Sequence, residues 1–92
     1  MMARYRSRPI TMEAVQWTGA NWDEVRQLDP AGRNLRLTRW GLEVTGPDGD
    51  WRLQPFGTWV GCTDDGHFVV VSDEAFRYHF ERVTDDESGH RA

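Results

Sequence analysis

Three clusters of turn-forming residues in the second half of the chain most strongly limit how it can fold. They lie at residues 46–49, 55–57 and 64–66, and each combines glycine with proline or aspartate. These residue types favour tight turns, and Asp64-Asp65-Gly66 is typical of a β-hairpin. Strands joined by such turns pair in antiparallel fashion. We therefore predict antiparallel strands at residues 42–44, 51–53, 58–62 and 67–71, and we expect the last and most apolar of them to be the central strand.

Two further strands are predicted in the first half from the alternation of side chains. Residues 10–17 alternate between one face with Ile10, Met12 and Ala14 and another with Thr11, Glu13, Val15 and Trp17. Residues 35–40 alternate between one face with Leu35 and Leu37 and another with Arg36, Thr38 and Trp40. The arginine-rich residues 4–8 precede the first strand as a lead-in for which no element is predicted.

Capping signals predict two short helices. Asn21 followed by Glu24 resembles a capping box, and the spacing of Trp22, Val25 and Leu28 predicts a helix that ends before Pro30. Ser72 can cap a second helix that begins at Asp73. The spacing of Phe76 and Phe80 fits a continuation of this helix, and the alternative is a closing strand over residues 78–83.

These elements predict an α+β protein with a small, mostly hairpin-connected antiparallel sheet of about five strands and one or two short helices. We expect residues 1–83 to form a single domain. Residues 84–92 are acidic and polar, and we expect them to form a disordered tail.

The composition of the 92 residues excludes several classes of protein. No apolar run approaches the roughly 18 residues of a membrane-spanning helix, and no apolar stretch follows the basic start as in a signal peptide. The single cysteine, Cys62, excludes an internal disulfide and a zinc site of several cysteines. These features predict a cytoplasmic protein without membrane contact.

Charge is unevenly divided along the chain. Residues 1–46 hold seven arginines and five acidic residues, whereas residues 47–92 hold four arginines and ten acidic residues. The net charges of +2 and −6 sum to the −4 of the whole chain, so we expect no non-specific binding to nucleic acid. All eleven basic residues are arginine, whose planar group suits carboxylates, phosphates and aromatic rings.

Residues 5–21 contain a basic start followed by the run EAVQWTG. This stretch resembles the start of a family of small phage- and prophage-encoded proteins of unknown function, where a basic run precedes EAVQWTGDN. Residues 51–83 resemble their C-terminal half more loosely. Phe56 precedes the glycine of the family's PGDY-type turn, and Thr58 stands in place of its aspartate. The resemblance implies a phage or prophage origin and a place in the cytoplasm of the bacterial host.

No pattern in the chain indicates catalysis. The three histidines, His67, His79 and His90, show no metal-ligand spacing, and the glycines form no phosphate loop. Cys62 has no basic neighbour in sequence, so we expect a structural thiol. Asp64 and Asp65 form a carboxylate pair, but a hairpin turn requires the same residues. We predict a non-enzymatic protein without a cofactor or metal.

Arginine and tryptophan together predict a binding site. Arg36, Arg39 and Trp40 lie close in sequence, and Trp17 and Trp59 could add aromatic planes. An aromatic plane beside a guanidinium suits a nucleobase with its phosphate. The alternative is that Trp17 and Trp59 belong to the core and the arginines are solvated.

Three functions are compatible with these features. The first is a phage accessory protein that sequesters a small anionic, nucleotide-type ligand, such as an immune signal of the host, and acts as a homo-oligomer in an anti-defence role. The second is an inhibitor that blocks a host defence protein with an acidic surface formed by Asp48, Asp50, Asp64, Asp65, Asp73 and Glu74. The third is a minor virion or assembly component that pairs through an exposed strand edge.

Overall fold

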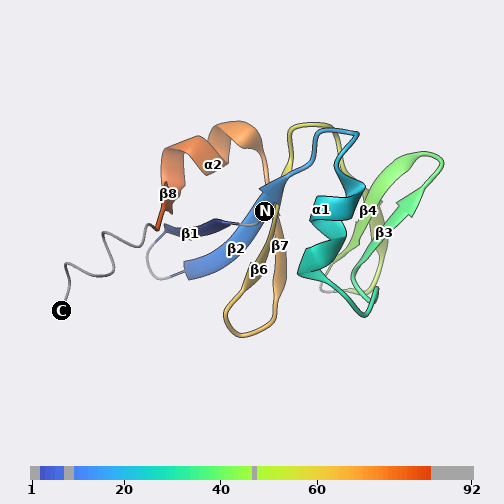
Figure 1. Cartoon of the computed structure of the whole chain (residues 1–92), viewed down its shortest axis with the longest axis horizontal. Coiled ribbons are helices and arrows are strands. Elements are labelled where there is room, and N and C mark those ends of the chain that lie inside the picture. Colours follow the sequence, from blue (N-terminus) through green and yellow to red (C-terminus); the bar gives the residue numbers. More distant parts are fainter. Residues whose placement is uncertain (1–2, 8–9, 47, 84–92) are drawn as a thin grey trace.

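The computed structural model describes residues 3–7, 10–46 and 48–83, so the expected tail at 84–92 lies outside the described residues. Within them the chain forms eight strands and two short helices (Figure 1). In chain order the elements are β1 (Ala3–Ser7), β2 (Ile10–Gln16), α1 (Trp22–Val25), the 3-10 turn η1 (Arg26–Leu28), β3 (Leu35–Thr38), β4 (Gly41–Thr45), β5 (Trp51–Leu53), β6 (Trp59–Thr63), β7 (Phe68–Val71), α2 (Asp73–His79) and β8 (Glu81–Arg82). This arrangement confirms the α+β class.

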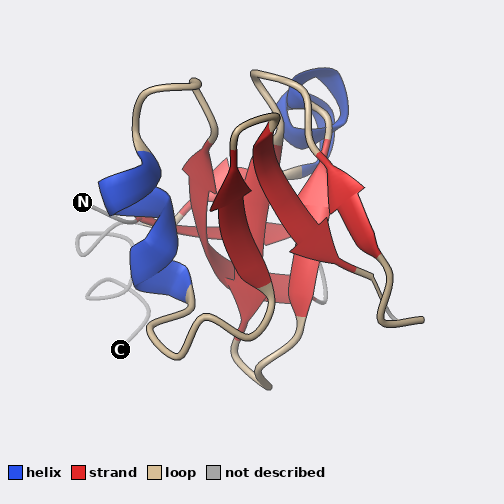
Figure 2. Cartoon of the chain, turned by 90° about the vertical axis from the view of Figure 1, so that its right-hand side faces the viewer, coloured by secondary structure: helices blue, strands red, loops and turns tan. Residues whose placement is uncertain are grey.

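The strands form two antiparallel sheets rather than one. The larger sheet has the order β7-β6-β2-β1-β8, and the smaller has the order β3-β4-β5. The larger sheet has the expected number of about five strands, and residues 35–53 add a second sheet because they pair only among themselves. Figure 2 shows the smaller sheet at the near end of the molecule with α1 beside it and α2 behind.

β2 and not β7 is the central strand of the larger sheet. β2 pairs with β1 on one side and with β6 on the other, whereas β7 pairs only with β6. The expectation that the most apolar segment would be central is wrong because β2 has buried side chains on both faces. Met12 and Ala14 lie on one face, and Val15 and the following Trp17 lie on the other.

β1 forms from the arginine-rich residues for which no element was predicted. Its tyrosine, Tyr5, packs edge-on against Trp59 and Phe76. Its arginines point to the other face, where Arg4 binds Asp64 at 2.9 Å and Arg6 binds Glu81 at 2.8 Å. Pairing with β2 and the packing of Tyr5 hold this basic strand in the sheet, and the carboxylates offset the charges of its two arginines.

The two faces of the larger sheet carry different cores. One face is mostly aliphatic, apart from Trp17, and contacts α1 and the smaller sheet; its buried residues are Val15, Trp17, Val25, Leu28, Leu35, Leu42, Val44 and Val60. The other face is aromatic and is covered by α2, whose Phe76 ring stacks on Trp59 at 3.8 Å and on Phe80 at 5.1 Å.

Close packing at Gly61 brings β6 against β2. A Cβ atom on Gly61 would lie 2.2 Å from the sulfur of Met12, which is fully buried. Because no side chain fits at that distance, glycine at position 61 is what allows Met12 to fill the space above β6.

Both alternatives for the C-terminal segment are correct in part. Ser72 Oγ accepts a hydrogen bond from the Ala75 N–H at 3.2 Å, and α2 then continues to His79. The chain leaves the helix at Phe80 and pairs with β1 as the short strand β8.

Candidate functional site

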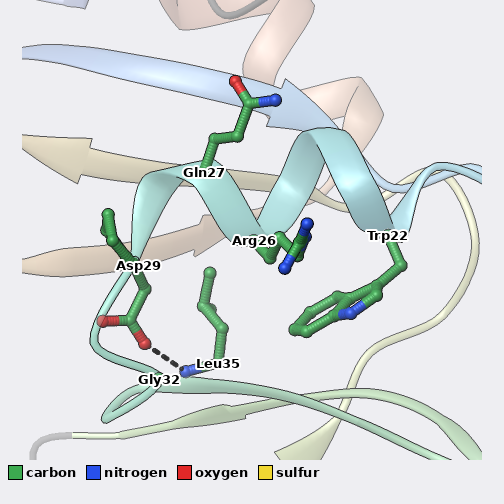
Figure 3. A pocket seen from close by; sticks show the side chains of 7 residues that line it. Trp22, Arg26, Gln27, Asp29, Gly32 and Leu35 are labelled. Atoms are coloured by element: carbon green, nitrogen blue, oxygen red, sulfur yellow. Dashed lines mark hydrogen bonds between the residues drawn. The ribbon is translucent and has the colours of Figure 1, made fainter.

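A hollow of about 580 Å³ lies between the helical segment α1–η1 and the loop that leads into β3 (Figure 3). Seven residues line it: Trp22, Arg26, Gln27, Asp29, Pro30, Gly32 and Leu35. The first three come from the helical segment and the others from the loop and the first residue of β3.

Asp29 holds the loop side of this hollow in place. Its carboxylate accepts hydrogen bonds from the backbone N–H groups of Asn34 at 2.7 Å and Leu35 at 2.9 Å. Its carbonyl accepts the N–H of Gly32 at 2.9 Å, and Gly32 has a positive φ of 71° that suits glycine. Since Asp29 and Leu35 are both buried, these bonds fix where the loop ends and β3 begins.

Trp22 and Arg26 contribute an aromatic ring and a positively charged guanidinium group to the lining of the hollow. The indole of Trp22 is half-buried against the aliphatic core, and in Figure 3 both side chains point toward the loop while Gln27 points away. Arg26 pairs with Asp23 at 3.5 Å, but 62% of the Arg26 side chain is exposed, so this surface pair is weak. The guanidinium is therefore accessible to a ligand beside an aromatic plane.

Arg33 adds a second positive charge to the loop. It follows Gly32, is exposed and forms no ion pair with any residue in the part of the chain that the structure describes. Arg26 and Arg33 thus bring two positive charges to the surroundings of the hollow, and Asp23 and Asp29 bring two negative charges.

Asn21 connects the start of α1 to the end of β2. Its amide donates to the Gln16 carbonyl at 2.8 Å and to Glu24 Oε1 at 3.0 Å. Its side-chain oxygen accepts from the N–H and hydroxyl of Thr18 rather than from the helix, and Glu24 bonds the side-chain amide of Asn21 rather than its backbone N–H, so the predicted capping box does not form. These bonds fix the position of Trp22, the next residue.

The arginines and tryptophan predicted as a site on one strand face are placed differently. β3 ends at Thr38, so Arg39 and Trp40 lie in the turn before β4, and the prediction that Arg36 and Trp40 share a strand face is wrong. Arg36 binds Glu43 at 2.7 Å and covers the ring of Trp51 at 4.1 Å. Arg39 lies 4.8 Å from the ring of Trp40, which is 69% exposed.

The other two predicted ligand residues lie in the two cores. Trp17 is only 2% exposed, and its buried indole N–H has no hydrogen-bond partner within the part of the chain that the structure describes. Trp59 stacks on Phe76, and its N–H donates to Asp73 at 2.9 Å. The structure therefore does not bring Trp17, Trp59 and the arginines of residues 36–39 together.

Trp22 and Arg26 were missed because Trp22 was assigned to the apolar face of the predicted helix. A signal was present, because residues four apart in a helix lie on the same face. The spacing of Trp22 and Arg26 thus placed an aromatic ring beside a cation, but it did not show that the loop opposite would leave a hollow.

The thiol and the two carboxylates considered for catalysis, those of Cys62, Asp64 and Asp65, are partly buried or bonded to neighbouring side chains. Burial raises the pKa of the Cys62 thiol, which disfavours the reactive thiolate. Asp64 binds Arg4, and Asp65 binds Thr63 and lies 3.1 Å from His67 within the hairpin turn. Across residues 3–7, 10–46 and 48–83, no group of three or more histidine, cysteine and acidic side chains could hold a metal ion, and no helix is long and apolar enough to cross a membrane.

The chain is thus a small α+β protein with a partly open hollow beside α1. Comparison of the chain with family models, curated proteins and solved structures gives no match.

Proposed function

We propose that this protein binds and sequesters a small anionic ligand of nucleotide type in the hollow beside α1, without catalysis. The observation that carries the proposal is that Trp22 and Arg26 face one hollow whose opposite wall is held by Asp29. An indole offers a plane for a base, worth about 1–3 kcal/mol per stacked base. A guanidinium offers paired donors for a phosphate.

The size of the hollow suits a single nucleotide. Sites for small molecules commonly measure roughly 300–1,000 Å³, and the hollow of about 580 Å³ falls within that range. The net charge of −4 supports local recognition of one anionic group rather than binding along a nucleic-acid backbone.

The resemblance of residues 5–21 to phage proteins supports a role for such binding in the host cytoplasm. A phage accessory protein that captures a nucleotide-type immune signal needs affinity and abundance but no reaction. The proposed anti-defence role therefore requires only the groups found around the hollow.

The acidic-surface inhibitor has less support. Four of its six acidic residues have basic partners: Asp48 with Arg52, Asp64 with Arg4, Asp65 with His67, and Asp73 with Arg77. Local pairing reduces the negative potential that such a surface would present to a basic partner protein.

Isothermal titration with AMP, its uncharged nucleoside adenosine and cyclic dinucleotides tests the proposal. We expect binding of at least one phosphorylated probe, and binding of adenosine at least about tenfold weaker than that of AMP because it lacks the phosphate. Trp22→Ala should weaken binding about tenfold or more through lost stacking. Arg26→Gln should remove the preference for AMP over adenosine.

The matched control pair is Trp40→Ala and Arg39→Gln, which changes the same two residue types at the exposed hairpin turn. These variants should bind like the unmodified protein. Loss of binding in the control pair with retention in Trp22→Ala would move the site to the hairpin turn. Absence of binding to every phosphorylated probe would overturn the proposed function.

A further inference from the structure

β7 is an edge strand without the features that usually protect such edges. Its sequence, Phe-Val-Val-Val, contains no charge, proline or glycine, and Val70 is 43% exposed. At the opposite edge of the same sheet, β8 consists of Glu81 and Arg82 (Figure 1). Charged residues discourage pairing with another strand, whereas an apolar, β-branched edge favours it.

The register shows which backbone groups of β7 are free. The Thr63 N–H donates to the His67 carbonyl at 2.8 Å, so this pair is hydrogen-bonded. Hydrogen-bonded pairs alternate along an antiparallel ladder, so the next ones are Gly61 with Val69 and Trp59 with Val71. The N–H and C=O groups of Phe68 and Val70 therefore point away from β6, and none of the described residues bonds to them.

We propose that two copies of this chain pair through β7, in antiparallel orientation about a two-fold axis at Val70. Val70 would then exchange both of its outward hydrogen bonds with Val70 of the second copy. The two five-stranded sheets would join into one continuous sheet, and the two exposed Val70 side chains would cover each other. This inference is independent of the hollow beside α1.

The pairing of a histidine, which can donate a hydrogen bond, with an aspartate favours a second copy in this register. With Val70 at the axis, His67 of one chain lies opposite Asp73 of the other, at the acidic start of α2. With the axis at Val69, Asp65 would instead lie opposite Asp73, and like charges opposite each other are destabilising. Ser72 has extended backbone (φ −63°, ψ 155°), so the edge remains suitable for pairing up to the start of the helix.

Light scattering coupled to size exclusion, with circular dichroism to verify folding, tests the proposal. The unmodified protein should have twice the mass of one chain. Val70→Lys should have the mass of one chain because two like charges would meet at the axis. Val70→Pro should also be monomeric, because it removes an outward N–H while leaving the bonds between β6 and β7 intact.

Mixing Val70→Lys with Val70→Glu provides the specific readout. Only if Val70 faces its own copy do the opposite charges meet, so the mixture should recover the doubled mass. Leu53→Lys, on the edge strand of the smaller sheet and 53% exposed, is the matched control and should stay dimeric. A monomeric unmodified protein, a dimeric Val70→Lys variant or a monomeric mixture would each overturn the proposal.

Discussion

A hydrophobic core lies on each face of the larger sheet, and the two cores consist of different kinds of side chain. The face under α2 is closed by stacked rings, with Phe76 between Trp59 and Phe80. The face toward α1 is filled by aliphatic side chains from α1 and both sheets. Flat rings stacked at close distance leave little empty space. On the other face a short helix, a loop and a second sheet meet, and the hollow remains at the edge of this contact. The candidate binding site therefore lies beside the aliphatic core.

The polar atoms of the two cores differ in the same way. On the aromatic face, Asp73 accepts hydrogen bonds from Trp59 at 2.9 Å, Gln16 at 3.1 Å and Arg77 at 2.9 Å, which joins α2 to β2 and β6. On the other face, the indole N–H of Trp17 is buried and has no hydrogen-bond partner among the described residues. The polar groups of the aromatic face are thus the better satisfied of the two.

Truncation of one central side chain on each face gives the largest expected effect. Phe76→Ala should lower the free energy of unfolding by about 3–5 kcal/mol because it removes the ring between two others. Val25→Ala on the aliphatic face should cost about 2 kcal/mol, since it removes fewer buried atoms. Urea denaturation measures both values. A larger loss for Val25→Ala than for Phe76→Ala would contradict this expected order.

Replacement of Asp29, which accepts hydrogen bonds from two backbone N–H groups at the end of the loop, tests whether the hollow depends on this one side chain. Asp29→Ala should lower the free energy of unfolding by about 3 kcal/mol, because two backbone N–H groups, one of them on buried Leu35, lose a charged acceptor. The same variant should lose binding of AMP. Asp48→Ala is the matched control: Asp48 accepts the Asp50 N–H in an exposed turn, so its removal should change stability far less. Equal losses would show that Asp29 has no special role.

The two indole N–H groups allow a direct comparison of the faces. Trp59→Phe removes a bonded donor and should cost about 1–2 kcal/mol. Trp17→Phe removes a buried donor that has no partner among the described residues, which favours folding, but it also leaves empty space because phenylalanine is smaller. The two effects oppose each other, so the free energy of unfolding should change by no more than about 1 kcal/mol. Denaturation of the two variants gives both numbers. A larger cost for Trp17→Phe would mean that its indole has a partner in solution, such as a buried water.

The smallest expected effect is a pH dependence at the aromatic face. The hydrogen bond from Trp59, followed by that from Arg77, holds the pKa of Asp73 below its ordinary value of 3.8. A lowered pKa stabilises the folded state above the unfolded value of about 3.9, and this contribution is lost as the pH falls through the folded value. The stability difference between the unmodified protein and Asp73→Asn should therefore be constant near neutral pH and shrink below about pH 4. A difference that does not change with pH would contradict this origin.

Local signals in the sequence predicted most of the elements but not how the sheets divide. Alternation placed β2 correctly, and the Ser72 cap placed the start of α2. The separation of residues 35–53 into a second sheet depends on contacts between distant segments, which alternation does not encode. The same limit explains why β1 was missed, since its arginines are stabilised by Asp64 and Glu81, far away in sequence.

The candidate site was less predictable than the fold. Residue types predicted that arginine and tryptophan would be used together, but the five predicted residues lie in the two cores, on the exposed side of β3 and in the turn that follows it. The hollow depends on the hydrogen bonds by which Asp29 holds the following loop beside α1. No sequence pattern around an aspartate before Pro30 predicts these bonds. The residue types in a sequence show which groups could bind a ligand, but a hollow forms only when distant segments pack together in the tertiary structure.

The close approach of Gly61 to Met12 has a consequence for how this chain could diverge. Positions 12 and 61 share one volume, so neither can change in size alone without strain or an empty space. A larger residue at position 61 becomes acceptable only after position 12 has become smaller, and the order of the two substitutions then matters. In relatives of this chain the two positions should vary together, with a large residue at one accompanied by a small residue at the other.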